Sequence, residues 1–190
     1  MKTYLLPSLK LTIILLVILA GIYPLAIAAL GELTIGGGGG QTIQVNGRTV
    51  GYANIGQKFT KDSYCWPRPS AVDYKADASG GSNKGPSNPD HLKDVERRIQ
   101  DFLKSNPGVT RAQIPAELVT SSGSGLDPDL SPAGAKIQSA RIAKAREISQ
   151  ELVLQAIDQN TEGPLLGMFG PAKVNILKLN VALDALKIKK

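Results

Sequence analysis

Residues 11–30, LTIILLVILAGIYPLAIAAL, decide the architecture of this chain because they contain no charged side chain. A helix of this length is about 30 Å long, which is the thickness of the hydrocarbon core of a bilayer. The same stretch also fits a secretory signal peptide, with Lys2 and Lys10 as its basic region and Ala26-Ile27-Ala28 as an A-x-A cleavage site. The pattern alone leaves the anchor and the cleaved signal open, and either one carries the rest of the chain across a membrane.

The charges that flank the apolar stretch predict its orientation. Lys2 and Lys10 precede it, and no lysine or arginine follows until Arg48. Basic residues close to a membrane helix stay on the cytoplasmic side. We therefore expect residues 1–10 in the cytoplasm, a transmembrane helix over residues 11–30, and an extracytoplasmic remainder.

Three residues of the predicted helix share one stripe. Gly21, Pro24 and Ala28 recur at helical spacing, and small side chains in such a stripe let another membrane helix approach closely. The alternative is that glycine and alanine are common in membrane helices and that Pro24 only kinks this one. A lone anchor has no need of a proline that frees the carbonyl of Ala20, which favours a partner-helix contact.

The chain beyond residue 30 divides into a tether and one soluble domain. Residues 31–41 include the five consecutive glycines Gly36–Gly40, which cost much backbone entropy to order and predict a flexible tether. Residues 42–190 begin with alternating polarity around Asn46-Gly47, a pair that tolerates positive φ at both turn positions, and this predicts a β-hairpin. Short strands and helices without regular β-α alternation predict a mixed α+β domain.

Helix signals recur through this domain. Asn88-Pro89 predicts the start of one helix, and Ser131-Pro132 the start of a second that runs through Ala145. Ser149 and Asn175 are the caps expected for two more. Between these elements we expect a long loop over residues 60–88, an extended piece over residues 114–120, and breaks at Gly163-Pro164 and Gly170-Pro171.

Composition excludes several functions. The formal net charge is +6, but without the terminal lysines Lys2, Lys10, Lys187, Lys189 and Lys190 the chain keeps 17 basic and 16 acidic side chains. With aromatic residues at only 5%, this nearly neutral body lacks the basic, stacking surface of a nucleic-acid partner. One cysteine and one histidine predict neither a disulfide nor a metal site. A phosphate loop, a G-x-S-x-G elbow and an S-x-x-K motif are all absent, so we expect no catalytic residues.

Two serine- and glycine-rich loops hold the candidate binding residues. One contains Ser79, Gly80, Gly81 and Ser82, and the other contains Ser122 and Ser124. Their backbone N–H groups could form an anion-binding nest. The alternative is a pair of solvent-exposed loops.

Other charged or reactive residues have simpler interpretations. Arg141 and Lys144 share a helix face that could serve a phosphate, but we interpret it as solvated surface. Cys65 is expected to be a small apolar filler rather than a reactive thiol. Asp127-Pro128-Asp129 predicts a turn into a helix and not a calcium loop, because Pro132 stands where such a loop needs glycine.

A series of short motifs extends over nearly the whole chain. The runs are Gly21-Ile22-Tyr23-Pro24-Leu25, Ile55-Gly56-Gln57, Phe59-Thr60, Arg68-Pro69-Ser70-Ala71, Ala78-Ser79-Gly80-Gly81-Ser82-Asn83, Ser87-Asn88-Pro89, Glu117-Leu118-Val119-Thr120, Ser124-Gly125-Leu126-Asp127-Pro128, Gln138 with Arg141-Ile142-Ala143-Lys144-Ala145-Arg146, Val174-Asn175-Ile176-Leu177, Leu179-Asn180 and Ala182-Leu183-Asp184. This ordered set resembles the C chain of potassium-transporting ATPases, the KdpC family, in which the runs occur in the same order. Cys65-Trp66-Pro67 departs from the family, which commonly has phenylalanine and glycine there, as do Ser121 and Gly123, where alanines are usual.

The resemblance implies a non-catalytic accessory subunit of a P-type pump that uses ATP to import potassium. Its implied partners are the ATP-hydrolysing and potassium-pathway subunits, together with the lipid of the cell inner membrane around an uncleaved helix. The family is described as a catalytic chaperone that raises the ATP affinity of the hydrolysing subunit. No tightly bound cofactor is implied, and ATP would be engaged only through that other subunit.

Nucleotide contact by this chain conflicts with the predicted orientation, because ATP is cytoplasmic and the domain is expected outside. If such contact occurs, the candidate residues are Gln138, whose amide could read a base edge, and the two serine-glycine loops. The alternative to a pump subunit is a freestanding exported binding module with a cleaved signal peptide. The resemblance favours the pump subunit.

Overall fold

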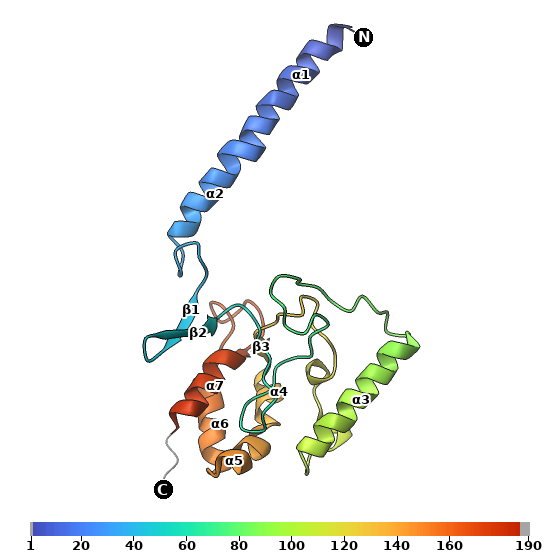
Figure 1. The fold of residues 1–190 in the computed structure, drawn as a ribbon, viewed down its shortest axis with the longest axis vertical. Coiled ribbons are helices and arrows are strands. Elements are labelled where there is room, and N and C mark those ends of the chain that lie inside the picture. The colour runs from blue at the N-terminus through green and yellow to red at the C-terminus, as the bar shows by residue number, and fades with distance from the viewer. Residues whose placement is uncertain (1, 187–190) are drawn as a thin grey trace. The chain divides into compact units, whose positions relative to one another are not determined.

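The computed structural model describes residues 2–186, so the predicted basic tail of Lys187, Lys189 and Lys190 lies outside the described residues. The chain divides into two compact units, with the boundary between Thr42 and Ile43. Figure 1 draws both units, and each is considered by itself.

The first unit is a long helix with one widened turn. Its parts are α1 (Lys2–Leu16), the π-helical segment η1 (Val17–Ile22) and α2 (Tyr23–Glu32). The N–H of Tyr23 bonds to the carbonyl of Ile18, one residue further back than in an α-helix. Pro24 follows directly, and a π turn widens the backbone where the proline has no N–H to donate. The predicted helix is confirmed and extends beyond residues 11–30; from Tyr4 to Glu32 it is long and apolar enough to cross a membrane.

The segment after this helix forms consecutive turns. The N–H of Gly37 bonds to the carbonyl of Thr34 at 3.0 Å, and that of Gly39 bonds to Gly36 at 3.0 Å. Four glycines of this segment, Gly36, Gly37, Gly38 and Gly40, have positive φ. The flexibility of residues 31–41 stays a prediction.

The second unit begins with the expected hairpin, β1 (Thr42–Val45) and β2 (Arg48–Tyr52). Asn46 and Gly47 have φ of 51° and 75°, as the turn between them requires. The long loop is also confirmed, since residues 60–88 contain no helix or strand.

A small antiparallel sheet was not expected. It contains β3 (Asp129–Leu130), β5 (Lys173–Asn175) and β4 (Thr161–Glu162) in that order. Leu130 pairs with Val174, and Thr161 pairs with Val174 on the other side. Strands of two or three residues are too short to show an alternation of polar and apolar side chains. The sequence therefore predicts only the Gly-Pro breaks next to β4 and β5.

Side-chain caps mark the first residues of most helices in this unit. They are α3 (Pro89–Ser105), α4 (Pro132–Lys136), α5 (Ser139–Arg146), α6 (Gln150–Gln159) and α7 (Ile176–Ala185). The side chains of Asn88, Ser131, Ser149 and Asn175 each accept a backbone N–H of the first turn, which confirms the four predicted caps.

Two local predictions are wrong. The helix from Ser131 is not continuous, because Ile137 and Gln138 separate α4 from α5. The piece over residues 114–120 is not extended: it contains the 3-10 helix η3 (Ala116–Leu118), which begins after Pro115, while another, η2 (Arg111–Gln113), precedes it.

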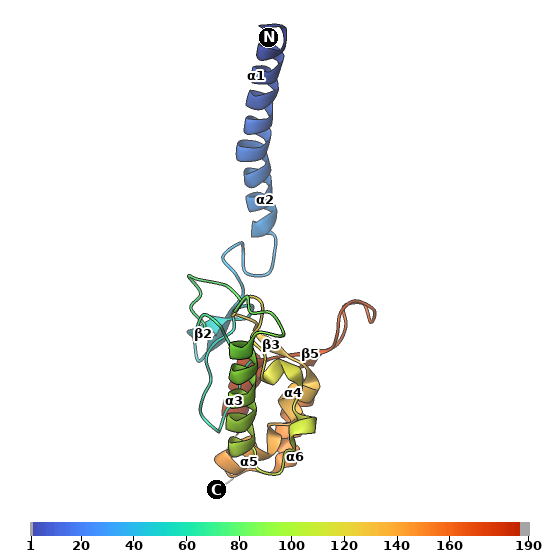
Figure 2. The same ribbon diagram turned by 90° about the vertical axis from the view of Figure 1, so that its right-hand side faces the viewer.

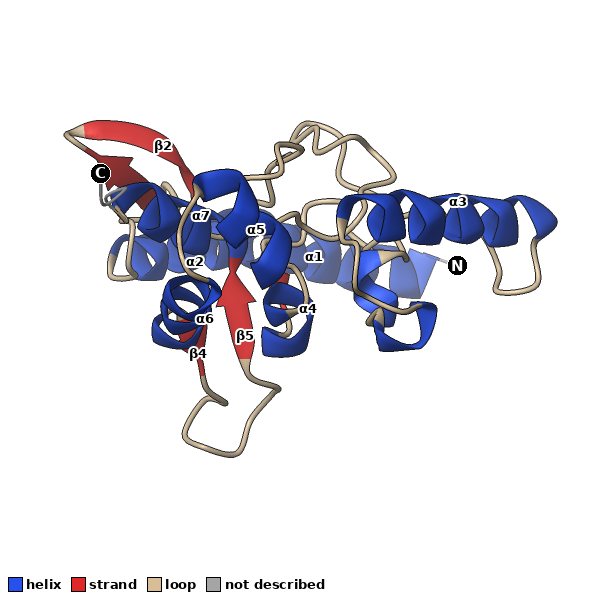
Figure 3. Cartoon of the chain, turned by 90° about the horizontal axis from the view of Figure 1, so that it is seen from below, coloured by secondary structure: helices blue, strands red, loops and turns tan. Residues whose placement is uncertain are grey.

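One apolar core holds this unit together. Leu130, Ile142, Ile157, Leu179 and Leu183 are its largest fully buried apolar side chains. Figure 3 shows β5 with α4 and α6 on either side of it. Helix α3 lies to one side of the other helices of this unit in Figures 1 and 3, and Phe102 is its side chain in the core. The fold is α+β with one candidate membrane helix, as expected.

Candidate functional site

The buried side chain of Arg141 on α5 is the centre of the polar contacts in the domain. Its Nη1 donates to the carbonyls of Asp62 at 2.6 Å and Tyr64 at 3.0 Å. Its Nε donates to Asn106 Oδ1 at 3.2 Å, and its Nη2 donates to Gln138 Oε1 at 2.6 Å. The interpretation of Arg141 as solvated surface is therefore wrong, because protein acceptors replace water around its charge. Burial lowers the pKa of Arg141 to about 10.

Gln138 is fully buried beside it, and its amide is bonded within the chain. Its Nε2 donates to the carbonyls of Trp66 and Gly134, both at 3.1 Å. Its Oε1 accepts the backbone N–H of Trp66 at 2.9 Å in addition to the bond from Arg141. The Trp66 ring lies 3.9 Å from the Arg141 guanidinium carbon, a cation-π contact. The amide therefore ties the tryptophan backbone to α5.

Two further side chains hold the same loop. Asn180 on α7 accepts the N–H of Cys65 at 2.8 Å and donates to its carbonyl at 3.0 Å. Arg146 donates from Nε to the carbonyl of Ser63 at 2.6 Å. The five consecutive carbonyls of residues 62–66 thus each accept from a side chain of α5, α7 or Gln138. Side chains satisfy this backbone where a sheet partner is missing.

Cys65 is enclosed by these contacts. Its side chain has no exposed surface, and burial raises the pKa of its thiol to about 12. A thiol in this state is neutral and unreactive near neutral pH. This supports the interpretation of Cys65 as an apolar filler.

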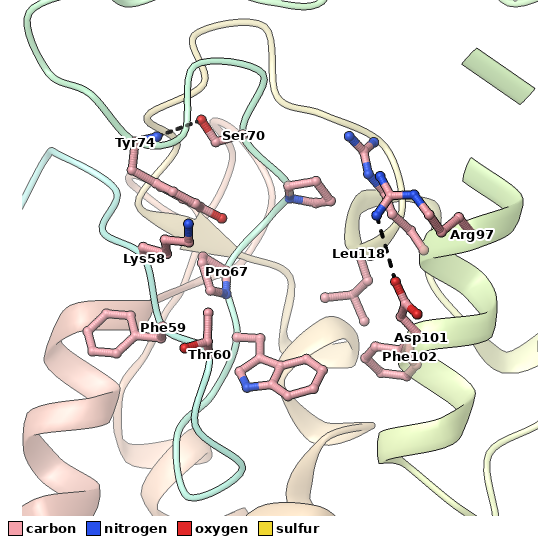
Figure 4. Close-up of a pocket in the computed structure, with 13 residues that line it drawn as sticks. Lys58, Phe59, Thr60, Pro67, Ser70, Tyr74, Arg97, Asp101, Phe102 and Leu118 are labelled. Atoms are coloured by element: carbon pink, nitrogen blue, oxygen red, sulfur yellow. Dashed lines mark hydrogen bonds and ion pairs between the residues drawn. The ribbon is translucent and has the colours of Figure 1, made fainter. Parts of the chain in front are cut away.

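The anchored loop forms one wall of a pocket of about 400 Å³. Figure 4 shows Phe59 and Pro67 on the loop side and Phe102 with Arg97 on α3. Leu118 of η3 closes the back of the pocket. The lining is mainly apolar and aromatic, which is typical of small-molecule sites and of docking pockets.

Two of the basic groups that line this pocket lie near carboxylates, and a third, Arg98, donates from Nη1 to the carbonyl of Val119 at 3.1 Å. Lys58 contacts Asp73 at 2.6 Å, and its hydrogen bond lowers the pKa of that carboxyl. Arg97 lies 3.9 Å from Asp101. Burial raises the pKa of Tyr74 to about 12, so this phenol is neutral.

The two predicted serine-glycine loops lie against each other. Ser79 Oγ and the N–H of Gly80 both donate to the carbonyl of Ser124, at 3.0 and 2.8 Å. The N–H of buried Ser122 donates to Pro69 at 3.1 Å. Two of the N–H groups expected in an anion nest are thus bonded within the chain. The structure brings the loops together but places Gln138 elsewhere, inside the helical layer.

Comparison of the sequence with known proteins identifies its family. The family model described as K+-transporting ATPase, c chain, matches residues 5–185. A "Potassium-transporting ATPase KdpC subunit" of Flavobacterium psychrophilum is 51% identical over 94% of this chain and 96% of its own length. That of Flavobacterium johnsoniae has the same values, and that of Bacteroides fragilis is 46% identical over 98% of this chain and 99% of its own.

The chain belongs to the KdpC family. KdpC proteins are membrane-associated subunits of a potassium-transporting ATPase, so this chain is an accessory subunit whose partners are other pump subunits. Gln138, Arg141, Arg146 and Asn180, the four residues that anchor the loop, all lie in runs that carried the resemblance. The runs that contain these four residues therefore help to stabilise the fold of the domain.

The sequence indicated some of these residues and missed others. Gln138 and Arg141 are three positions apart, a spacing at which two side chains on a helix can meet, and this signal could have indicated the pair. No sequence pattern points to Asn180, because its partner Cys65 lies 115 residues away. Within residues 2–186, no group of three or more His, Cys, Asp or Glu side chains is arranged to hold a metal.

The remaining predicted site residues lie on the first unit. Gly21 belongs to the π-helical segment, and Pro24 and Ala28 to α2. A Cβ atom built on Gly21 would meet nothing within 4 Å, so the helix surface is open there. Contact of this stripe with a partner helix stays a prediction.

Proposed function

We propose that this chain is a single-pass subunit of the cell inner membrane, with its amino terminus in the cytoplasm and its α+β domain outside. In this arrangement the helix binds lipid and the helices of the other subunits, and the domain binds their external face. The positive-inside bias of Lys2 and Lys10 supports the orientation. Uncleaved retention of the helix distinguishes this proposal from an exported module.

The single observation that carries the proposal is the exposed surface of the first helix. Leu16, Leu19 and Ile22 are each about 60% exposed, at 62%, 61% and 59%, and no side chain of this unit covers them. An apolar helix of this length is stable only when lipid or other helices bury it. The stripe of Gly21, Pro24 and Ala28 is the face we assign to a partner helix.

We also propose that any effect on ATP affinity is indirect. Gln138 is fully buried and its amide is bonded to Trp66, Gly134 and Arg141, so it has no free edge for a base. An extracytoplasmic domain is separated from cytoplasmic ATP by the bilayer. The chain would therefore raise nucleotide affinity by stabilising one arrangement of the partner subunits.

Labelling of single introduced cysteines tests the orientation. The native thiol, Cys65, is buried and has a raised pKa, so it provides a silent background for a membrane-impermeant maleimide. Ser8→Cys and Ser82→Cys place exposed thiols before and after the uncharged residues 11–30. In intact spheroplasts we expect S82C to be labelled at once and S8C only after permeabilisation. The reverse pattern would place the domain in the cytoplasm.

Two measurements test the accessory role itself. Removal of this chain should lower the potassium-dependent ATPase activity or the recovery of the remaining purified complex. Full activity with intact assembly would overturn the proposal. The intact mass of the mature chain should include residue 1 or 2, whereas a start near Ala29 would support the exported module.

A further inference from the structure

An apolar arm projects from the small sheet. It consists of residues 163–171, Gly-Pro-Leu-Leu-Gly-Met-Phe-Gly-Pro, which connect β4 to β5. Figure 3 shows this connection running out beyond the helices that flank β5, and Figure 2 shows the same projection from the side. The apolar arm makes no contribution to the core of the domain.

The four large side chains of the arm are the most exposed apolar groups of the domain. Leu165, Leu166, Met168 and Phe169 are 70%, 79%, 75% and 60% exposed. Elsewhere in the described part of this domain, the exposed large apolar residues are Val50, Tyr52, Leu92 and Leu152, at 40–55% and scattered over separate elements. Clustered exposure of this kind marks an interaction surface, whereas single exposed residues need no explanation.

The arm has an ordered backbone. Leu165 and Phe169 form an isolated antiparallel bridge, with N–H to carbonyl distances of 2.9 and 3.0 Å in the two directions. A proline at each end, Pro164 and Pro171, restricts the stem. Leu166 has a φ of +54°, a left-handed conformation that is unfavourable for a leucine, and its exposed side chain gains no contact within the chain in return.

The composition of the arm decides between lipid and protein as its occupant. Residues 163–171 contain no lysine, arginine, tryptophan or tyrosine, the residues that anchor a segment at a membrane surface. The nearest basic residue, Lys173, already contacts Asp129 at 2.8 Å, and Glu162 at the other stem is negative. Phenylalanine and methionine are enriched at protein interfaces, and a preorganised backbone lowers the ordering cost of fitting a shaped pocket. Fluid lipid has no fixed shape for the arm to match, so a preorganised backbone would add nothing to binding lipid.

We propose that the apolar arm inserts into an apolar pocket on the extracytoplasmic surface of another subunit of the pump. The inference rests on the proposed function, because it needs both that partner and that side of the membrane. The arm then acts as the docking element that fixes the domain on the complex, and the four exposed side chains are its anchors.

Photocrosslinking in the assembled pump tests the occupant. Phe169 is replaced by p-benzoylphenylalanine, which keeps an aromatic ring at the tip, and Tyr52 receives the same group as a matched exposed control. After irradiation of native membranes, we expect an adduct between position 169 and a larger pump subunit, mapped to an extracytoplasmic segment. An adduct with lipid alone or with a second copy of this chain would overturn the inference.

Removal of the anchors tests their contribution. In L166N/M168Q the tip becomes polar, and asparagine tolerates the positive φ of position 166. We expect the full-length chain to keep its melting temperature in detergent but to lose about tenfold or more in affinity for the remaining complex. Leu92→Asn, at the most exposed large apolar residue of the described domain outside the arm, is the control and should assemble normally.

The outcomes separate this inference from the proposed function. If the wild-type chain does not co-purify with the pump, the proposed function fails. If it co-purifies and L166N/M168Q does so equally well, with no subunit adduct from position 169, only the docking arm is disproved.

Discussion

Arg141 Nη2 donates a 2.6 Å hydrogen bond to Gln138 Oε1 inside the domain, three residues away on the chain and out of reach of solvent. The pair joins the helical layer to the loop that carries Trp66, since Gln138 bonds both backbone groups of that residue. The guanidinium of Arg141 is thus held mainly by carbonyl and amide oxygens, with the Asp62 carboxylate 3.9 Å from its Nη1. Its removal leaves several buried acceptors without a donor.

We predict that Arg141→Leu destabilises the full-length chain by about 3 kcal/mol. The change leaves the carbonyls of Asp62 and Tyr64 and the side-chain oxygen of Asn106 without their donor, and Gln138 Oε1 keeps only the N–H of Trp66. Urea unfolding followed by the fluorescence of the single tryptophan, which contacts Arg141, measures the change. Lys144→Leu, on the same helix but exposed, should stay within about 0.5 kcal/mol. Equal effects of the two changes would show that the buried bonds contribute nothing.

Asn180→Ala should cost about 2–3 kcal/mol, because it leaves the buried N–H and carbonyl of Cys65 unpaired. Asn180→Asp, of nearly the same size, should be at least as harmful, since a carboxylate cannot donate to that carbonyl. The same unfolding assay applies, with exposed Asn54→Ala as the control. A stable N180D chain would contradict the two-way bond.

Gly56→Ala should destabilise the domain by about 1–3 kcal/mol. A Cβ at this position would lie 2.5 Å from the backbone oxygen of Asp127, and backbone cannot move aside as a flexible side chain can. The N–H of Gly56 also bonds to the carbonyl of Leu126 at 2.7 Å, which fixes the close approach. Gly123→Ala, where a Cβ would meet nothing within 4 Å, is the matched control and should be nearly neutral. Thermal unfolding of both variants compares them.

The stability of the chain should fall between pH 8 and pH 10 partly through Cys65. Its thiol has a folded pKa of about 12 against an ordinary value of 9.0, so above pH 9 the unfolded state loses the proton first. The folded state then binds more protons, and stability decreases by up to about 1.4 kcal/mol per pH unit from this group. Urea unfolding of wild type and Cys65→Ala at both pH values isolates this contribution. The wild type should lose more stability than C65A, and parallel losses would contradict the raised pKa.

Local signals accounted for much of the fold. The four helix caps, the turn at Asn46-Gly47 and the apolar first helix depend on residues a few positions apart, so their physics is readable from the sequence. The 3-10 turn at residues 116–118 and the break at Ile137 were missed. At both places contacts between distant segments outweigh the conformation that the local sequence prefers. One example is Glu117, which accepts hydrogen bonds from the N–H and Oγ of Ser131.

The candidate site was harder to predict. The sequence marks Gln138 and Arg141 as polar residues of one helical segment, but their burial depends on the loop at residues 62–66, which is more than 70 positions away. For the apolar arm, the sequence predicts only the two breaks at Gly163-Pro164 and Gly170-Pro171. Its identity as a projection depends on β4 and β5 pairing at its base.

The chain by itself therefore determines a membrane-length apolar helix, a domain of capped helices, and membership of a pump-subunit family, because these depend on composition and short-range spacing. Only the tertiary structure decides that Arg141 is buried, that Gln138 serves the fold, and that four apolar side chains project together into solvent. Those outcomes depend on which distant segments meet, and the free energy of burying a group is set by its neighbours in space rather than by its neighbours in sequence.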